Sequence, residues 1–421
     1  MTRQLGYAAP PATWQDVVRP GGRYVALPSR GRPMVIAEDD PGVLRYLRTA
    51  MLSRPPRSRL PGWPYLLAGQ GLRVPGIARV LPAAALPAPA DGRERSELTR
   101  FIGDGRWRML VLLHSRDVDA ACVLLLFRPG VERPDRAVKL ACSRPAAARV
   151  DLEATRLAAL AEVLGDRLGN CVPRVVDVLD HGGLPALVTT AQPGVSMLVR
   201  YHRGGRTADR RSVCADLAAA ERWLGGLQAA SAGPDRPLDL APGTIERLAE
   251  WRTREPAAEP VIDRLAGVRR RLRLHRAPTT WVHGDFWPGN LLVEGDEITG
   301  VVDWERSEQA GGPLRDPIRF VLGYAYYLDR HTPAGRRVRG HRGLVAGEPG
   351  AGVRYAFTGA GWFPDAVRAF LARALARCGL PADCARDAVL GEVAAVAAEA
   401  SDPGFLRDYL ALFLALSETW P

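Results

Sequence analysis

Acidic and amide side chains follow one another at a chemically useful spacing near residue 283. The segment reads Val282-His-Gly-Asp-Phe-Trp-Pro-Gly-Asn290, so Asp285 lies two positions after His283 and five before Asn290. A second acid, Asp303, follows shortly afterwards. Phosphoryl transfer needs a base or orienting group for the acceptor hydroxyl, oxygen ligands for magnesium, and a cation on the nucleotide phosphates. Asp285, Asn290 and Asp303 meet the first two needs, because Mg²⁺ prefers hard oxygen ligands and keeps several waters.

The third requirement, a cation, points to the one lysine of the chain. Of the 57 lysines and arginines, only Lys139 is a lysine. A position that keeps lysine in so arginine-rich a chain favours a compact ammonium over a planar fork. Downstream, Glu153 falls on one helical face with three leucines, at 157, 160 and 164. A carboxylate on an apolar face is costly unless a cation pairs with it, so we expect a Lys139–Glu153 pair, with Asp151 and Glu162 as alternative partners.

Short elements must bring the acids and the amide together. Two apolar runs, residues 291–293 and 298–302, flank a polar turn and predict a hairpin that ends at Asp303. A loop, a hairpin and a second acid then place Asp285, Asn290 and Asp303 around one point.

The wider pattern predicts a small β-rich lobe followed by a larger helical lobe. The first lobe begins as an antiparallel meander with Lys139 in its third strand, and its strands are expected over 109–113, 122–127, 137–141, 175–179 and 186–189. Helical spacing of apolar residues predicts helices over 150–164, 211–230, 244–254, 260–275, 317–328, 365–378, 384–400 and 403–416. The Gly- and Arg-rich segment 332–361 has no period and is expected to be a loop insertion.

Residues 1–94 form an N-terminal extension. Runs at 24–27 and 34–37 predict two strands, and Asp40-Pro41 is typical of a helix N-cap followed by proline in the first turn. The Pro- and Ala-rich stretch 82–90 indicates a linker. The expected domains are therefore 1–94, a β lobe over 95–192 and a helical lobe over 193–421. The fold class is α+β.

These residues carry a family resemblance. His283-Gly-Asp-Phe-Trp-Pro-Gly-Asn290, Val301-Val-Asp-Trp304, Ala137-Val-Lys139 and Gly312-Pro-Leu-Arg-Asp316 resemble the aminoglycoside phosphotransferase and choline-kinase-like family of small-molecule kinases. The resemblance covers roughly residues 95–330. It implies a two-lobe, protein-kinase-like fold, to which residues 1–94 are an addition. Residues 114–119 contain no glycine, whereas kinases have a Gly-rich loop between their first two strands.

The resemblance also implies a role for each residue. The cofactors would be ATP and Mg²⁺, and the adenine would lie near 188–192. The implied site consists of Asp285 as catalytic base, Lys139 and Glu153 at the ATP phosphates, Asn290 and Asp303 as magnesium ligands, His283 as a brace of the loop, and Asp316 as a structural residue bonded to nearby backbone.

Composition excludes several classes of protein. The chain has 421 residues, 47% hydrophobic and 24% charged, with a net charge of +11. It carries no nucleic-acid-reading motif, so we expect no nucleic-acid partner. Six scattered cysteines without C-x-x-C spacing argue against structural zinc and disulfides. The chain has neither an apolar run near the ~20 residues that span a bilayer nor a signal peptide, which favours a cytoplasmic protein away from membranes.

The sequence leaves the acceptor open. A small-molecule hydroxyl on a sugar, nucleoside, amino alcohol or antibiotic-like metabolite is favoured over a peptide Ser or Thr, and a pseudokinase scaffold or nucleotide sensor is the alternative of another class. Trp287 and Trp304 are interpreted as core or wall residues more readily than as substrate platforms. The arginine cluster at 336–342 is either a solvated loop or a clamp for an anionic acceptor. ATP or GTP, the oligomeric state and the pathway stay undetermined.

Overall fold

The computed structural model describes residues 14–18, 22–27, 34–51, 96–103, 105–113, 121–164, 168, 170–240 and 242–420. They divide into two compact units. The first contains the described residues of 14–51, 96–162 and 172–195, and the second contains the rest. The expected linker at 82–90 and the glycine-free segment 114–119 lie outside the described residues.

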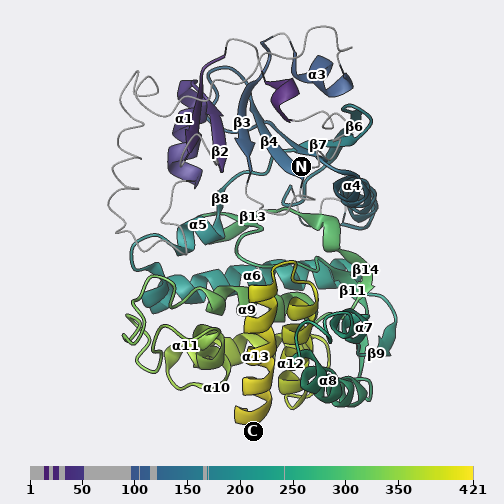
Figure 1. Ribbon diagram of the computed structural model, residues 1–421, viewed down its shortest axis with the longest axis vertical. Helices are drawn as coiled ribbons and strands as arrows, with labels where there is room; N and C mark the ends of the chain where they lie inside the picture. Colours follow the sequence, from purple (N-terminus) through teal and green to yellow (C-terminus); the bar gives the residue numbers. More distant parts are fainter. Residues whose placement is uncertain are drawn as a thin grey trace, which may run out of the picture. The chain divides into compact units, whose positions relative to one another are not determined.

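The first unit is built on one antiparallel sheet of seven strands, in the order β1-β2-β3-β4-β5-β7-β6 (Figure 1). The strands are β1 (Tyr24–Leu27), β2 (Val35–Glu38), β3 (Arg108–Leu112), β4 (Cys122–Phe127), β5 (Arg136–Leu140), β6 (Val175–Asp180) and β7 (Pro185–Thr190). The meander β3-β4-β5 is the one that the alternation of apolar runs predicted. The N-terminal pair extends the same sheet, because β2 pairs with β3 from Val35 to Ala37.

Both faces of this sheet are covered. On one face, Tyr24, Ile36, Val111 and Leu124 belong to a core that also includes Leu98 of α3. On the other face, the alternating residues of the same strands pack against α1. The N-cap residue of α1, Asp40, accepts from the backbone N–H groups of Gly42 and Val43. The helical segments of the unit are η1 (Trp14–Val17), α1 (Pro41–Tyr46), η2 (Leu47–Met51), α3 (Glu97–Ile102) and α4 (Arg144–Leu164).

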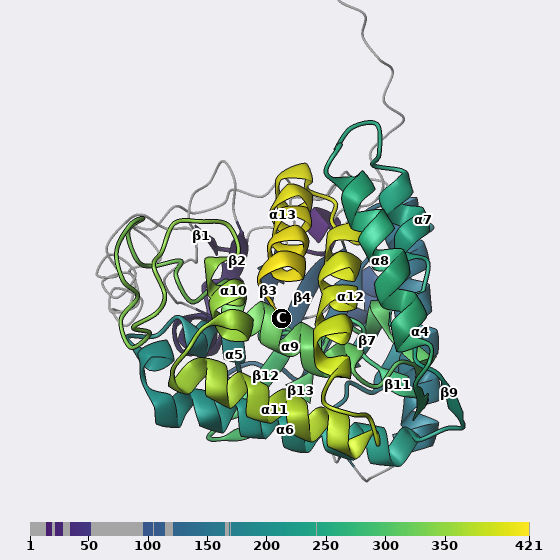
Figure 2. The same ribbon diagram turned by 90° about the horizontal axis from the view of Figure 1, so that it is seen from below.

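The second unit is mainly helical. Its long helices are α6 (Arg210–Ser231), α8 (Ala258–Leu272), α9 (Arg315–Tyr326), α11 (Trp362–Arg377), α12 (Cys384–Ala398) and α13 (Pro403–Thr419). Shorter helices are α5 (Met197–Tyr201), η4 (Arg206–Ala208), α7 (Thr244–Ala249), η5 (Trp304–Arg306) and α10 (Ala351–Thr358). Figure 2 shows α12 between α8 and α13, and it also packs on α9 and α11.

Short strands complete this unit. They are β9 (Asp235–Pro237), β10 (Arg276–Pro278), β11 (Thr280–Val282), β12 (Leu291–Glu294), β13 (Glu297–Val301) and β14 (Glu308–Gly311), while the chain passes between units at β8 (Val195–Ser196). The predicted hairpin is β12–β13, with Leu291 opposite Val301. An antiparallel β unit followed by a larger helical unit confirms the α+β fold class.

The prediction of a loop throughout 332–361 is wrong, because α10 lies within that segment. This helix starts after Gly350, whose φ is 69°. A side chain at Gly352 would place its Cβ 2.1 Å from the carbonyl oxygen of Ala325, so close packing requires glycine there. Glycine lowers helix propensity, and burial of Val353, Ala356 and Phe357 against the unit's core overrides it.

Two exclusions drawn from composition can be compared with the structure. All six cysteines are free thiols. Among the described helices, none combines the length and the apolarity that a bilayer crossing requires.

Candidate active site

The loop 283–290 connects β11 to β12, and its second residue has to be glycine. Gly284 has a φ of 80°, in the left-handed region that favours glycine. A Cβ at this position would lie 2.2 Å from the carbonyl oxygen of Arg306. The close approach of the backbones at Gly284 and Arg306 fixes the position of the next residue, Asp285.

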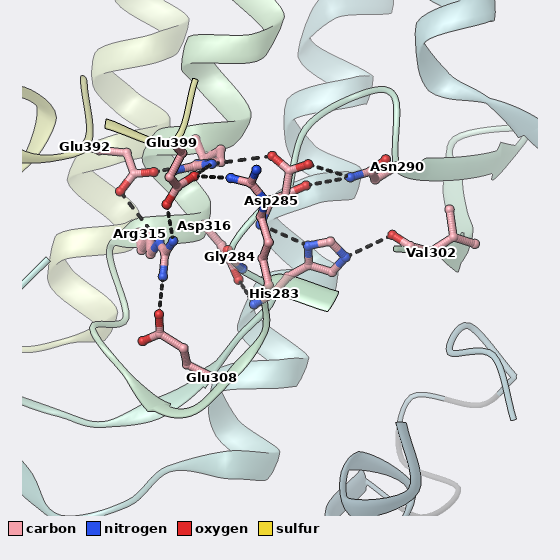
Figure 3. A network of polar contacts seen from close by, with 12 residues as sticks. His283, Gly284, Asp285, Asn290, Val302, Glu308, Arg315, Asp316, Glu392 and Glu399 are labelled. Atoms are coloured by element: carbon pink, nitrogen blue, oxygen red, sulfur yellow. Dashed lines mark hydrogen bonds and ion pairs between the residues drawn. The ribbon is translucent and has the colours of Figure 1, made fainter. Parts of the chain in front are cut away.

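His283 braces this loop from within the core. Its ring is fully buried, its Nδ1 accepts from the backbone N–H of Asp285 at 3.2 Å, and its Nε2 lies 3.0 Å from the carbonyl oxygen of Val302. Because Nδ1 accepts, Nε2 carries the proton and donates. The imidazole therefore joins Asp285 to Val302, the residue before Asp303, as Figure 3 shows.

Asp316, near the start of α9, holds the same loop from the other side. Its carboxylate accepts from the backbone N–H groups of His283 at 2.6 Å and Gly284 at 2.9 Å. Burial raises the pKa of Asp316, while His283 and the two N–H donors oppose that rise. This contact with nearby backbone is the one that the family resemblance implied for Asp316.

Asn290 ties the end of the loop back to Asp285. Its Nδ2 donates to the backbone oxygen of Asp285 at 2.9 Å and to Oδ2 of the same residue at 3.1 Å. The backbone carbonyl oxygen of Asn290 accepts from the backbone N–H of Val302 at 3.0 Å. Asp285, Asn290 and Val302, the residue before Asp303, are thus connected by hydrogen bonds, which brings the backbone at the three predicted residues into one neighbourhood.

Asp303 follows the hairpin in an unusual backbone conformation. Its φ of 71° and ψ of 62° make it the one non-glycine residue with positive φ in the described part of the chain. The next residue, Trp304, is fully buried and donates from Nε1 to the carbonyl oxygen of Val301 at 2.8 Å. Trp304 is a core residue, and its anchoring helps to hold the strained turn that presents Asp303.

A cluster of ionic side chains surrounds the far side of Asp285. We call it the α9 ion cluster: Arg306, Glu308, Arg315, Arg319, Glu392 and Glu399. Figure 3 labels its members Glu308, Arg315, Glu392 and Glu399. Arg319 lies 3.4 Å from Oδ1 of Asp285 through its Nη1. This cluster was not predicted, although Glu392 is the one charged residue of the apolar run 388–398 on α12, the same kind of signal that identified Glu153.

Charges inside the cluster shift two carboxyl groups in opposite directions. Burial raises the pKa of Glu392 to about 7, against the attraction of Arg319 and Arg315. Burial acts in the same sense on Glu399, but Arg319, Arg315 and Arg306 outweigh it and lower the pKa of Glu399 to about 2. The difference follows from the arginines that each carboxylate contacts.

In the first unit, Lys139 and Glu153 meet as the sequence predicted. The ammonium Nζ of Lys139 lies 2.6 Å from Oε2 of Glu153, which is buried on the leucine face of α4. The two alternative partners, Asp151 and Glu162, are exposed on that helix. Lys139 is flanked in register by Val123 and Leu187, so it stands in the centre of the sheet.

Comparisons with known proteins identify the family. The model of the family described as "Phosphotransferase enzyme family" matches residues 94–316, more than half of the chain. The chain belongs to this phosphotransferase family. The sequence-based prediction of a small-molecule phosphotransferase is confirmed at that level. No curated protein matches the phosphotransferase chain.

Solved structures similar to the phosphotransferase are distant. Aminoglycoside phosphotransferase APH(3'')-Id from Streptomyces rimosus is 16% identical, covers 77% of this chain and 99% of its own, and has a TM-score of 0.40. The ADP-bound APH(2'')-Ib is 13% identical over 76% and 95% of the two chains, with a TM-score of 0.42. The APH(4)-Ia variant in complex with ADP and hygromycin B is 12% identical over 76% and 92%, with a TM-score of 0.42.

The oxygen atoms in the phosphotransferase loop fit a hard divalent cation. Asn290 directs its Nδ2 at Asp285, so the amide oxygen is the atom that it offers to a metal. Asp303 is half-buried, and both ring nitrogens of His283, the one histidine of the loop, are already used in hydrogen bonds. One amide and one carboxylate with waters is a donor set that suits Mg²⁺.

Other predicted residues keep open roles in the phosphotransferase. The side chain of Trp287 is half-buried and stacks on Tyr327, with ring centroids 6.1 Å apart. The arginines of the 336–342 cluster are exposed, whereas His341 between them is buried and its Nε2 bonds the carbonyl oxygen of Thr207 at 2.8 Å. Whether they contact an acceptor stays a prediction, as does the adenine position near 188–192.

Proposed function

We propose that this protein is an ATP- and Mg²⁺-dependent kinase that phosphorylates a hydroxyl group of a small molecule. The observation that carries the proposal is the fixed carboxylate of Asp285. Its backbone is held by His283, and its side chain by Asn290. Phosphoryl transfer depends mainly on positioning and on charge, so an acid fixed in this way is suited to orient and deprotonate an acceptor hydroxyl.

The other residues would serve the nucleotide. Asn290 and Asp303 would hold Mg²⁺, which when bound neutralises charge on the phosphate oxygens. Lys139 would bind phosphate oxygens through its ammonium, and Glu153 would keep that ammonium in place from the buried face of α4. His283 and Asp316 would contribute by keeping the loop rigid.

The acceptor is proposed only as a class. A sugar, nucleoside, amino alcohol or antibiotic-like metabolite each offers a suitable hydroxyl. A polycationic aminoglycoside favours acidic surroundings, whereas the side chains next to Asp285 include Arg319 and, through Glu399, Arg306 and Arg315. We therefore favour a neutral or weakly charged acceptor over a polycation.

The test of the base is Asp285→Asn. Asparagine keeps the shape of the side chain but does not take a proton, so phosphoryl transfer should fall by at least about 100-fold. Mg-ATP affinity, measured by calorimetry, should stay within a few-fold. Asp296→Asn is the matched control, since Asp296 is exposed on the turn of the β12–β13 hairpin. Unchanged turnover in Asp285→Asn would remove Asp285 as the base.

Nucleotide binding is tested by thermal shift. A ligand at 100 times its dissociation constant stabilises the folded state by about 2.7 kcal/mol. The parent protein should show this shift with Mg-ATP, and Lys139→Met and Asp303→Ala should lose it, each variant being compared with its own ligand-free midpoint. If no nucleotide shifts the parent, the pseudokinase alternative gains over the kinase.

A further inference from the structure

Arg319 connects Asp285 to the carboxyl groups of Glu392 on α12 and of Glu399, the residue directly after α12. Its side chain is 6% exposed in the middle of α9. Nε donates to Oε1 of Glu392 at 2.5 Å, and Nη1 lies 2.7 Å from Oε2 of Glu399 and 3.4 Å from Oδ1 of Asp285. The guanidinium thus contacts α12 with one edge and the 283–290 loop with the same nitrogen that bonds Glu399.

Burial of this arginine is already compensated without Asp285. Glu392 and Glu399 lie at hydrogen-bonding distance, and together with Glu308 they match the three arginines of the α9 ion cluster in number. The approach to Asp285 is therefore an additional contact that neutralisation of Arg319 does not require. This additional contact involves Asp285, the residue that is the base in the proposed reaction.

The contact with Arg319 restricts the rotation of the Asp285 carboxylate. The terminal torsion of an aspartate is broad, so a carboxylate needs external groups to set its plane. Asn290 contacts Oδ2 and Arg319 contacts Oδ1, so the two oxygens are held from different sides. Rotation of the carboxylate would break both contacts. Errors of about 1 Å in position can cost on the order of 100-fold in rate.

We propose that Arg319 is a positioning residue for Asp285, anchored by Glu392 and Glu399 so that the carboxylate keeps the orientation in which it meets the acceptor hydroxyl. The inference rests on the proposed function, because it gives Asp285 the role of base. It assigns to α12 a part in the reaction that the residues of the loop do not reveal.

Arginine suits this role where lysine does not. The planar fork places Nε and Nη1 at a fixed angle, so one side chain reaches Glu392 on one side and Glu399 with Asp285 on the other. A lysine ammonium keeps the charge but bonds from a single point. Arg319→Lys should therefore retain Mg-ATP binding and lower turnover by about 10- to 100-fold, with little change in KM for ATP.

Arg315 is the matched control, one helical turn earlier on α9. It is as buried as Arg319 and contacts Glu399 at 2.8 Å and Glu392 at 4.0 Å, but its described ionic partners do not include Asp285. Arg315→Lys should lower the melting temperature about as much as Arg319→Lys does, yet leave turnover within about twofold. Equal loss of turnover in both variants would reduce Arg319 to a structural role.

A double-mutant cycle decides whether Arg319 acts through Asp285. The probe is phosphate release from labelled Mg-ATP by the full chain, with water as acceptor, for Asp285→Asn, Arg319→Lys and the double variant. If Arg319 positions Asp285, Arg319→Lys should cost nothing further in the Asp285→Asn background. Independent, multiplying losses would overturn the inference.

The outcomes separate the two proposals. If Asp285→Asn itself leaves turnover unchanged, the proposed base is wrong and the inference fails with it. If Asp285→Asn is inactive while Arg319→Lys is fully active, the inference alone fails. Should Arg319→Lys not fold, Glu392→Gln takes its place, because glutamine keeps the acceptor oxygen and weakens only the anchor. It should give a smaller loss of turnover that is likewise absent in the Asp285→Asn background.

Discussion

At the scale of single residues, the conformation of Asp303 carries information that its side chain does not. An L-residue in the left-handed region costs about 1–2 kcal/mol, and such strain persists where the surroundings enforce it. Here Trp304, buried and bonded to the carbonyl oxygen of Val301, lies directly after the strained position. Asp303 thus combines backbone strain with the role of a proposed metal ligand. Substitution by glycine and by alanine distinguishes the two properties.

Both Asp303→Ala and Asp303→Gly remove the carboxylate. Alanine keeps the backbone strain at the positive φ, whereas glycine relieves it. We expect Asp303→Gly to be more stable than Asp303→Ala by about 1 kcal/mol, measured by chemical denaturation. Neither variant should show the Mg-ATP thermal shift. Equal stability of the two would mean that the positive φ costs nothing at this position, and a retained shift would remove Asp303 as a metal ligand.

The residues of the loop could be predicted because their side chains suit one reaction and they lie close together in the sequence. Asp285, Asn290 and Asp303 fall within one loop and one hairpin, and Glu153 was selected by the leucines on its own helix. Arg319 and Glu392 are 73 positions apart, so no local period links them. Glu392, alone among apolar residues over 388–398, could have indicated that a buried cation was required, but not which of the 56 arginines supplied it.

At the scale of elements, α9 is the helix on which the site depends. Its first turn holds the 283–290 loop through Asp316, and its middle reaches Asp285 through Arg319. Sequence periodicity predicted this helix to start at 317, and it starts at Arg315. The two residues that were left out include Asp316, because helical spacing of apolar residues does not reveal a polar first turn.

The packing of α9 on α12 makes stability depend on pH through Glu392. Its pKa is about 7 in the folded protein against 4.5 for a free side chain, so the folded state binds the extra proton between these values. Stability should therefore fall as pH rises from about 4.5 to 7, by about 3 kcal/mol at most. Glu399 acts oppositely and at lower pH, because its pKa of about 2 adds stability as pH rises from 2 to 4.5.

Glu392→Gln should remove the first of these dependences. Melting temperatures at pH 5 and pH 8 should differ less in Glu392→Gln than in the parent. Glu250→Gln, at an exposed position, is the control and should keep the parental difference. The interpretation fails if the parent is equally stable at both pH values or if Glu392→Gln leaves the difference intact.

At the scale of the whole molecule, charge is carried almost wholly by arginine and carboxylate. The two-unit α+β architecture followed from the order of strand-like and helix-like segments. The extension of the sheet by β1 and β2, and the helix α10 inside the glycine-rich segment, depended on long-range packing that local propensity does not report. The net charge of +11 says little about the site, because the charges around Asp285 are paired.

The single lysine allows a test on the intact chain. At a pH at which the reagent modifies lysine side chains, an amine-reactive reagent has one side-chain target, Lys139. This side chain is 16% exposed and paired with Glu153. Mg-ATP should slow its modification at least several-fold if Lys139 binds phosphate, as read by mass spectrometry of the modified peptide. Modification of the N-terminal amine is the internal control and should not change. Equal rates with and without Mg-ATP would contradict the proposed role.

The position of this lysine in β5 has one more consequence. A protease that cleaves only after lysine has a single site in the entire chain, and that site lies in a strand paired on both sides, with β4 and with β7. Cutting there requires the middle of the sheet to open. The rate of this one cleavage under native conditions therefore reports how often the first unit unfolds, with no label and no substitution in the protein.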